Sequence, residues 1–198
     1  MRRWWNLPWS SLHSFSNALN PINKMESQIM EKNLEEELKT WISGFKKIVI
    51  LGIGNPIRKD DYVGVVIAKL LKEKNLLNTL ILECETVPES FTSIIKEAKP
   101  THVLMIDAAN LNATPGFAKM ISIDEINGFS LSTHDLPLSL LAKFIVYETK
   151  AKVALLGIQP KTLDFGEGLT SELSEASKKI AKIIEKVLIE ESFNQKLF

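Results

Sequence analysis

The sequence of 198 residues has a single cysteine, no excess of charge of either sign and no long hydrophobic run. One cysteine, Cys84, excludes a framework of disulfides within the chain and is typical of a reducing compartment, so we expect a cytoplasmic protein. Lys plus Arg and Asp plus Glu both number 24, which leaves no positive field to attract a nucleic acid. No apolar run approaches the ~20 residues of a membrane-spanning helix.

The first 24 residues lack acidic side chains but carry three of the four tryptophans. They also lack the apolar core of a secretory signal peptide. We interpret residues 1–24 as a disordered tail rather than a basic organelle-targeting peptide, and translation from Met25 would leave them out of the protein.

The next segment, residues 25–45, is predicted to form an amphipathic helix. Its apolar residues recur at intervals of three to five residues, and Gly44 would end the helix. We expect this helix to pack on the main domain, residues 46–198, or on a partner.

Short apolar segments alternate with longer amphipathic ones throughout the main domain. Apolar runs without polar alternation are typical of parallel strands that are covered on both faces. The pattern predicts an α/β fold, a three-layer α/β/α sandwich with a mostly parallel five-stranded sheet and helices on both faces. We expect strands at 48–51, 79–83, 103–106, 117–123 and 152–158, and helices at 61–74, 88–99, 137–149 and 171–190.

The loop after the first strand favours a cation over a nucleotide. In open parallel sheets, ligands bind outside the carboxyl ends of the strands. The run GIGNPIRKDDYVG at 52–64 is neither a phosphate loop nor a dinucleotide fingerprint, because Ile57 stands where the fingerprint has its third glycine. Asp60 and Asp61, at the start of the next helix, would repel a phosphate. Either aspartate could instead be a helix N-cap.

Two later polar residues are also candidates for a site at the carboxyl ends of the strands. Asp107 comes after the strand 103–106, where a desolvated carboxylate tends to be paired, metal-bound or raised in pKa. Hydrogen bonding to neighbouring loop amides is the simpler alternative. His134 lies in the loop before the helix 137–149, where it could also be a capping or structural histidine. His102 is expected at the surface.

Asp61, Asp107 and His134 come from three connections that an open parallel sheet would bring to one edge. Two carboxylates and one imidazole suit a divalent transition metal, and three protein ligands leave coordination positions for substrate or water. A serine or cysteine nucleophile is less well supported, because Ser132 lacks a strand–elbow–helix context and Cys84 has no evident base beside it.

The run at 52–64 resembles the N-terminal signature of the [NiFe]-hydrogenase maturation endopeptidases. The resemblance continues with ETVPESF at 85–91, MIDAAN at 105–110, STHDLPLSLL at 132–141 and GIQPKTLDFGEGLT at 157–170. The last two motifs look most like the branch that serves formate-hydrogenlyase-type hydrogenases. Family members often have glycines in the second loop, whereas this chain has Cys84-Glu85-Thr86.

This resemblance implies a protease that removes the C-terminal extension of a hydrogenase large-subunit precursor after nickel insertion. The family's metal-binding positions fall on Asp61, Asp107 and His134. The metal would be nickel carried by the substrate, and zinc or cadmium could occupy the same site. Attack by water and a transient acyl-carboxylate both stay open, with Asp60 as an auxiliary base or a helix cap. The alternative function is a non-proteolytic metal-sensing chaperone or adaptor for the same precursor.

Overall fold

The computed structural model of the chain describes residues 25, 28–125 and 137–195. Five strands form one sheet in the order β2-β1-β3-β5-β4. Strand β4 pairs antiparallel with β5, and all the other pairs are parallel. The strands are β1 (Ile48–Ile53), β2 (Thr79–Glu85), β3 (His102–Ala108), β4 (Ala118–Ser122) and β5 (Lys152–Ile158).

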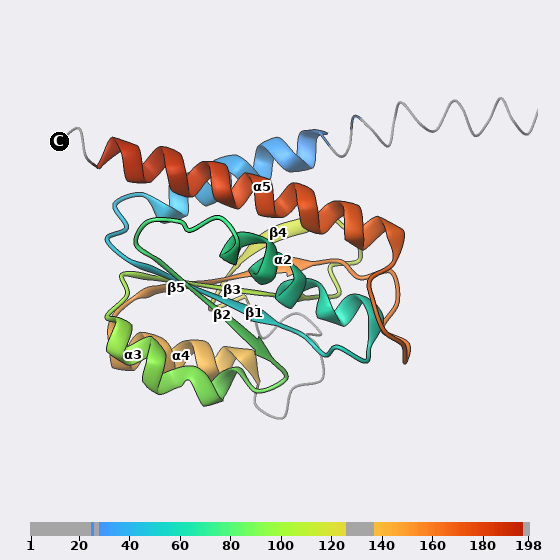
Figure 1. Cartoon of the computed structure of the whole chain (residues 1–198), viewed down its shortest axis with the longest axis horizontal. Coiled ribbons are helices and arrows are strands. Elements are labelled where there is room, and N and C mark those ends of the chain that lie inside the picture. Colours follow the sequence, from blue (N-terminus) through green and yellow to red (C-terminus); the bar gives the residue numbers. More distant parts are fainter. Residues whose placement is uncertain (1–24, 26–27, 126–136, 196–198) are drawn as a thin grey trace, which may run out of the picture.

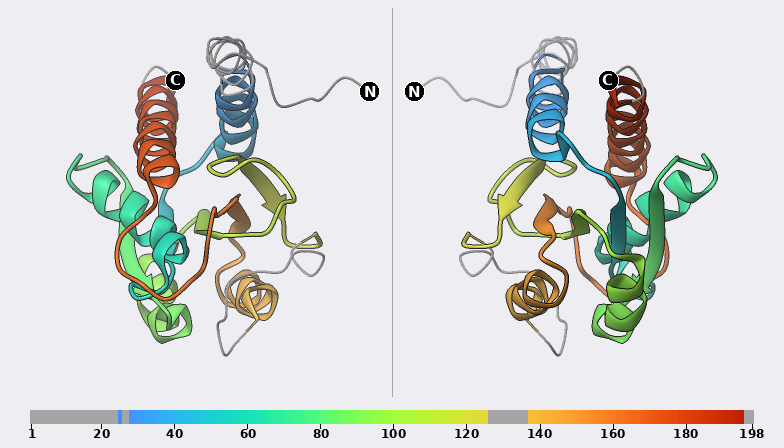
Figure 2. Two further views of the ribbon diagram at one scale, coloured as in Figure 1. Left: turned by 90° about the vertical axis from the view of Figure 1, so that its right-hand side faces the viewer. Right: turned by 90° about the vertical axis from the view of Figure 1, so that its left-hand side faces the viewer.

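Helices cover both faces of the sheet (Figure 1), which confirms the predicted α/β sandwich. The helix over residues 28–42, α2 and α5 lie on one face, and α3 and α4 lie on the other (Figures 1 and 2). No described helix is both long and apolar enough to cross a membrane. The labelled helices are η1 (Lys59–Tyr62), α2 (Val63–Lys72), η2 (Pro88–Phe91), α3 (Thr92–Ala98), α4 (Leu138–Thr149) and α5 (Ser171–Asn194).

The central strands are buried on both faces, as their unbroken apolar sequences predict. Every residue of β1 and β3 is buried. Because side chains alternate between the two faces of a strand, Ile48 and Ile50 belong to the core under α2 and α5. Val49 and Leu51 belong to the core under α3 and α4. These strands therefore hold the two helical layers together.

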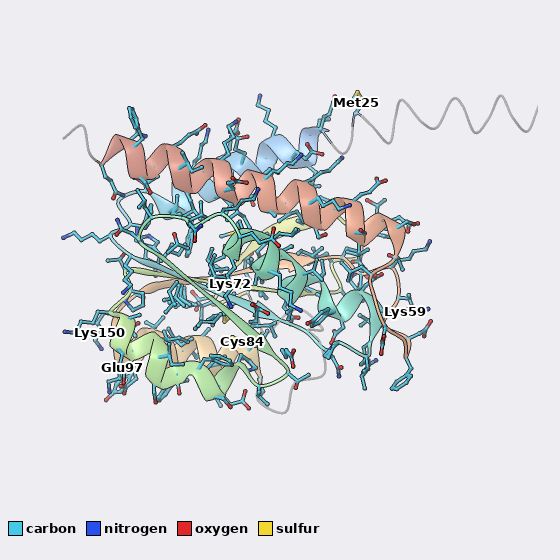
Figure 3. All side chains as sticks on the ribbon, in the orientation of Figure 1. Met25, Lys59, Lys72, Cys84, Glu97 and Lys150 are labelled. Atoms are coloured by element: carbon cyan, nitrogen blue, oxygen red, sulfur yellow. The ribbon has the colours of Figure 1, made fainter. Side chains whose placement is uncertain are left out.

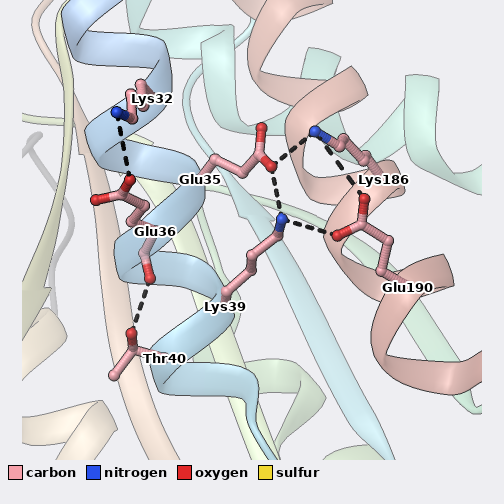
Figure 4. A network of polar contacts seen from close by, with 7 residues as sticks. All are labelled: Lys32, Glu35, Glu36, Lys39, Thr40, Lys186 and Glu190. Carbon is pink, nitrogen blue, oxygen red and sulfur yellow. Dashed lines mark hydrogen bonds and ion pairs between the residues drawn. The ribbon is translucent and has the colours of Figure 1, made fainter. Parts of the chain in front are cut away.

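The helix over residues 28–42 packs along α5. Leu34, Leu38 and Ile42 are buried against the core. Ile29, which the sequence pattern places on the same apolar face, is instead 52% exposed. A network of four charged side chains also links the two helices (Figure 4). Its members are partly exposed, so the buried aliphatic side chains contribute more to the packing than the ion pairs do. The four are Glu35, Lys39, Lys186 and Glu190.

His102 is buried, which corrects the prediction of a surface position. It is the first residue of β3 and is 3% exposed. The Trp41 ring packs edge-on against the imidazole, with 5.1 Å between the ring centroids. Its Nδ1 lies 3.0 Å from Thr101 Oγ1, and its buried Nε2 has no hydrogen-bond partner among the described residues. The prediction failed because β3 begins at His102 and the helix over 28–42 covers that end of the strand.

We predict that His102 makes the fold less stable at acid pH. Burial, followed by the nearby Lys152 ammonium, lowers the pKa of His102 from its ordinary value of 6.5. The Trp41 backbone opposes this shift by a smaller amount. Below pH 6.5 the unfolded chain therefore binds a proton at His102 more readily than the folded chain does. As a result, the free energy of unfolding falls as pH decreases through and below 6.5.

Denaturant unfolding of the wild type and of His102→Leu, from about pH 8 to about pH 5, measures this effect. The Leu variant lacks the titrating group, so its stability should decline less across that range. Equal declines in the two proteins would contradict the prediction.

Candidate functional site

The connections of the sheet reverse direction between β1 and β3. The chain passes from β1 to β2 on one side and then to β3 on the other side of β1. Ligands of open α/β sheets bind at such a switch point, outside the carboxyl ends of the strands. Asp107 is the last residue but one of β3, and Asp61 lies in η1, which follows β1 and contacts β3. The structure thus brings two of the three predicted ligands to one edge.

Figure 3 gives the orientation of this edge. Lys59, the first residue of η1, lies on the side where β1 ends, and Lys150 lies at the opposite end of the sheet. The last pair between β1 and β3 joins Gly52 to Ile106. Asp107 therefore follows directly after the last residue of β3 that pairs with β1, and it pairs with Gly157 of β5 on the other side.

Glycines allow the chain after β1 to pass very close to the strand ends. A Cβ on Gly64 would overlap the carbonyl oxygens of both Ile106 and Ile53, so the start of α2 lies directly against β1 and β3. A Cβ on Gly52 would lie 2.6 Å from the Gly64 carbonyl oxygen. The close-packing glycine that is missing at position 57 is thus supplied by Gly64.

Both aspartates at the switch point are buried and oriented by backbone amides. Asp61 is 1% exposed and accepts a hydrogen bond from Asn55 N–H at 3.0 Å on Oδ2. Asp107 is 0% exposed and accepts one from Ala108 N–H at 2.8 Å on Oδ1. The N-cap residues of η1 and α2 are Arg58 and Tyr62, so Asp61 is not a helix N-cap. Its carboxylate is held at the sheet edge instead.

Asp60 has a different environment from its neighbour. Its buried carboxylate accepts hydrogen bonds from Lys161 N–H at 2.9 Å, Thr162 N–H at 3.2 Å, Thr170 N–H at 2.7 Å and Thr170 Oγ1 at 3.0 Å. These donors belong to the β5–α5 loop (residues 159–170). Asp60 therefore joins η1 to that loop, and it is not the N-cap residue of η1 or α2.

The third predicted ligand, His134, lies outside the described residues, as does Ser132. Within the part of the chain that the structure describes, no three His, Cys, Asp or Glu side chains gather closely enough to hold a metal ion. The structure accordingly supplies a pair of carboxylates at the predicted edge, and the three-ligand site stays a prediction.

Cys84 is a poor nucleophile in this fold. Its thiol is buried near the end of β2, and burial, assisted by the negative charge of Glu89, raises the pKa of Cys84 to about 12. The thiolate is the reactive form of cysteine, and at neutral pH this thiol stays protonated. The structure agrees with the sequence analysis in giving no support to a cysteine protease.

The loop after β2 is tied to the loop after β1. Gly54 N–H donates to the Glu85 carbonyl at 3.0 Å, and the pairing of the two strands shifts register here. Glu85 adopts φ +49°, a left-handed conformation in which glycine is more easily accommodated. The absence of glycine in Cys84-Glu85-Thr86 is thus accommodated by one residue in an unfavourable backbone region.

Comparisons with known proteins agree on one family. The HycI family model, described as hydrogenase maturation protease, matches residues 65–187. A Methanocaldococcus jannaschii protein whose name describes it as a hydrogenase maturation protease is 43% identical over 140 residues. The match covers 67% of this chain and 83% of the relative. The hydrogenase 3 maturation protease of Escherichia coli is 29% identical over 138 residues, covering 69% of this chain and 88% of the relative.

The fold agrees as well. The crystal structure of a [NiFe] hydrogenase maturation protease, HycI from Thermococcus kodakarensis, superposes with a TM-score of 0.71 and 34% sequence identity. The superposition covers 76% of this chain and 97% of that chain.

We predict that Gly64→Ala destabilises the fold by about 3 kcal/mol, because the added methyl group must displace two strand ends that have no room to move. Denaturant unfolding measures the loss. Gly44→Ala is the control, since Gly44 has φ +74° but nothing within 4 Å of the added Cβ, and backbone strain alone should cost about 1 kcal/mol there. A Gly64→Ala protein as stable as the wild type would show that the close approach is unimportant.

Proposed function

The chain belongs to the HycI family of hydrogenase maturation proteases, and from this premise we propose that it removes the C-terminal extension of a [NiFe]-hydrogenase large-subunit precursor. The observation that carries the proposal is the presence of two buried, amide-oriented carboxylates, Asp61 and Asp107, at the switch point of the sheet. The formate-hydrogenlyase-type branch and a cytoplasmic location stay predictions.

In this proposal the precursor is recognised through the nickel ion that it carries. Two carboxylates from different connections offer a divalent cation oxygen ligands, and His134 would add a neutral imidazole nitrogen. The amide hydrogen bonds to Asp61 and Asp107 fix the direction of each carboxylate before the substrate arrives. A precursor without nickel would lack the cation that this site attracts, so cleavage would wait until the metal has been inserted.

The start of α4 supports His134 as the third ligand. The described chain resumes at Pro137, and α4 begins at Leu138. Helix α4 packs on β5 and leads into it through a short connection, so its first turn lies toward the end of the sheet where β1 and β3 end (Figure 1). The three residues from His134 to Pro137 can span at most about 11 Å.

Cleavage adds water across the peptide bond, with the hydroxyl oxygen going to the carbonyl carbon and a proton to the leaving nitrogen. The site would hold the metal-bearing end of the precursor so that one bond lies beside Asp61 and Asp107, which lowers the entropic cost of the attack. A carboxylate at this position can also accept a proton from the attacking water. Attack by water thus uses the same two carboxylates that we propose to bind the ion.

The test compares Asp61→Ala, Asp107→Ala and His134→Ala with the wild type on a nickel-loaded large-subunit precursor from the same organism. Loss of one ligand should reduce the rate of processing by about 100-fold or more, at ~1.4 kcal/mol per tenfold. The mass of the precursor before and after incubation measures the cleavage. Asp124→Ala, which removes an exposed carboxylate from a turn, should process at the wild-type rate.

Each outcome has a separate meaning. Undiminished processing by one of the three variants removes that residue from the mechanism. Equal cleavage of a nickel-free precursor removes recognition through nickel. A wild-type protein that binds the precursor without changing its mass would be an adaptor and not a protease.

A further inference from the structure

We propose that the β5–α5 loop is a second docking element for the precursor, with Phe165 as its apolar anchor and Asp60 as the residue that positions it. The inference rests on the proposed function and says where the precursor binds beyond its metal ion. It concerns an extended segment of the precursor next to the bond that is cut.

The loop is joined to the segment before Asp61 along its length. Lys59 N–H donates to the Gly166 carbonyl at 2.8 Å, and Gly166 N–H donates to the Ile57 carbonyl at 2.9 Å. The Arg58 guanidinium donates to the Leu163 carbonyl from Nε at 3.1 Å and from Nη2 at 3.0 Å. The loop therefore has a defined position relative to the chain that leads into the candidate site.

Asp60 completes this attachment. Its buried carboxylate accepts the four hydrogen bonds from Lys161, Thr162 and Thr170. Thr170 is the N-cap residue of α5, so Asp60 also anchors the place where the loop becomes a helix. Hydrogen bonds to a buried carboxylate are strong, and they come from both ends of the loop. Asp60 acts on binding through the loop and does not itself touch the substrate.

Phe165 is displayed by this attached loop. It is 81% exposed, more than any other large hydrophobic residue in the described ranges. Ile57, whose carbonyl accepts the Gly166 N–H, is 45% exposed on the facing segment. An aromatic side chain on a backbone already held in place is a good binding anchor, because little further conformational freedom is lost when a partner covers it.

The position of the loop indicates which molecule would contact Phe165. Arg58, which holds the loop, lies three residues before Asp61, and its backbone carbonyl accepts the Asp61 N–H at 3.0 Å. A protein substrate cut beside Asp61 must continue away from that point as an extended chain, at ~3.3 Å per residue. The loop is continuous with the candidate site, so the segment that meets Phe165 and Ile57 is the precursor itself, through an apolar side chain.

The first experiment measures cleavage and binding of the nickel-loaded precursor by Phe165→Ala. We expect KM and the dissociation constant to rise about tenfold, as for the loss of an interface anchor. The kcat should stay within about twofold, because the lost contact is the same in the ground and transition states. Phe193→Ala is the matched control, since Phe193 is 62% exposed near the other end of α5, and it should change neither constant.

The second experiment tests the positioning role of Asp60 through its partner. Thr170→Val removes the hydroxyl that donates to Asp60 and keeps the Thr170 N–H, whereas Thr170→Ser keeps both donors. We expect KM to rise about threefold for the Val variant and to return to the wild-type value for Ser, with kcat unchanged in both. A Val variant with wild-type KM would remove Asp60 from the account.

The outcomes separate this inference from the proposed function. If Phe165→Ala matches the wild type in KM and affinity while Asp61→Ala is inactive, the docking loop is wrong and the protease assignment stands. If the wild type does not cleave, the affinities of wild type and Phe165→Ala for the precursor still decide the inference. Equal affinities, or no binding by either, would overturn it.

Discussion

The site depends on the close approach of the start of α2 to the ends of β1 and β3. Only a residue without a Cβ fits at Gly64, because its backbone lies against the carbonyl oxygens of Ile53 and Ile106. This contact places η1 over the end of β3, where Asp107 lies. A larger residue would push η1 outward, separating Asp61 from Asp107 and weakening the attachment of the β5–α5 loop.

Two neighbouring aspartates serve different purposes because η1 turns their side chains toward different partners. Asp60 is bonded to the β5–α5 loop through both carboxylate oxygens, so it stabilises the arrangement. Asp61 is oriented by the Asn55 amide and lies beside the sheet edge. One short turn thus supplies both a carboxylate for the site and the attachment of the loop that we propose to bind the substrate.

The sequence predicts much of this arrangement, since the unbroken apolar runs of β1 and β3 indicate a sheet covered on both faces, and the switch-point rule then locates Asp61 and Asp107. It does not predict the partners of Asp60, because no local pattern indicates hydrogen bonds to residues about a hundred positions later. The burial of His102 was missed for a related reason, since its cover, Trp41, comes from a separate helix. The dinucleotide fingerprint would place the close-packing glycine at position 57, whereas in this fold Gly64 allows the helix to approach the strands. Long-range packing decided each of these cases.

The central claim is that Asp61, Asp107 and His134 share one divalent ion at the switch point. Crystals soaked with nickel or cadmium test it directly through anomalous diffraction. The account predicts one strong peak about 2.0–2.3 Å from a carboxylate oxygen of each aspartate and from an imidazole nitrogen of His134. A peak elsewhere on the molecule with none between these side chains, or a His134 imidazole turned away from the two carboxylates, would contradict it.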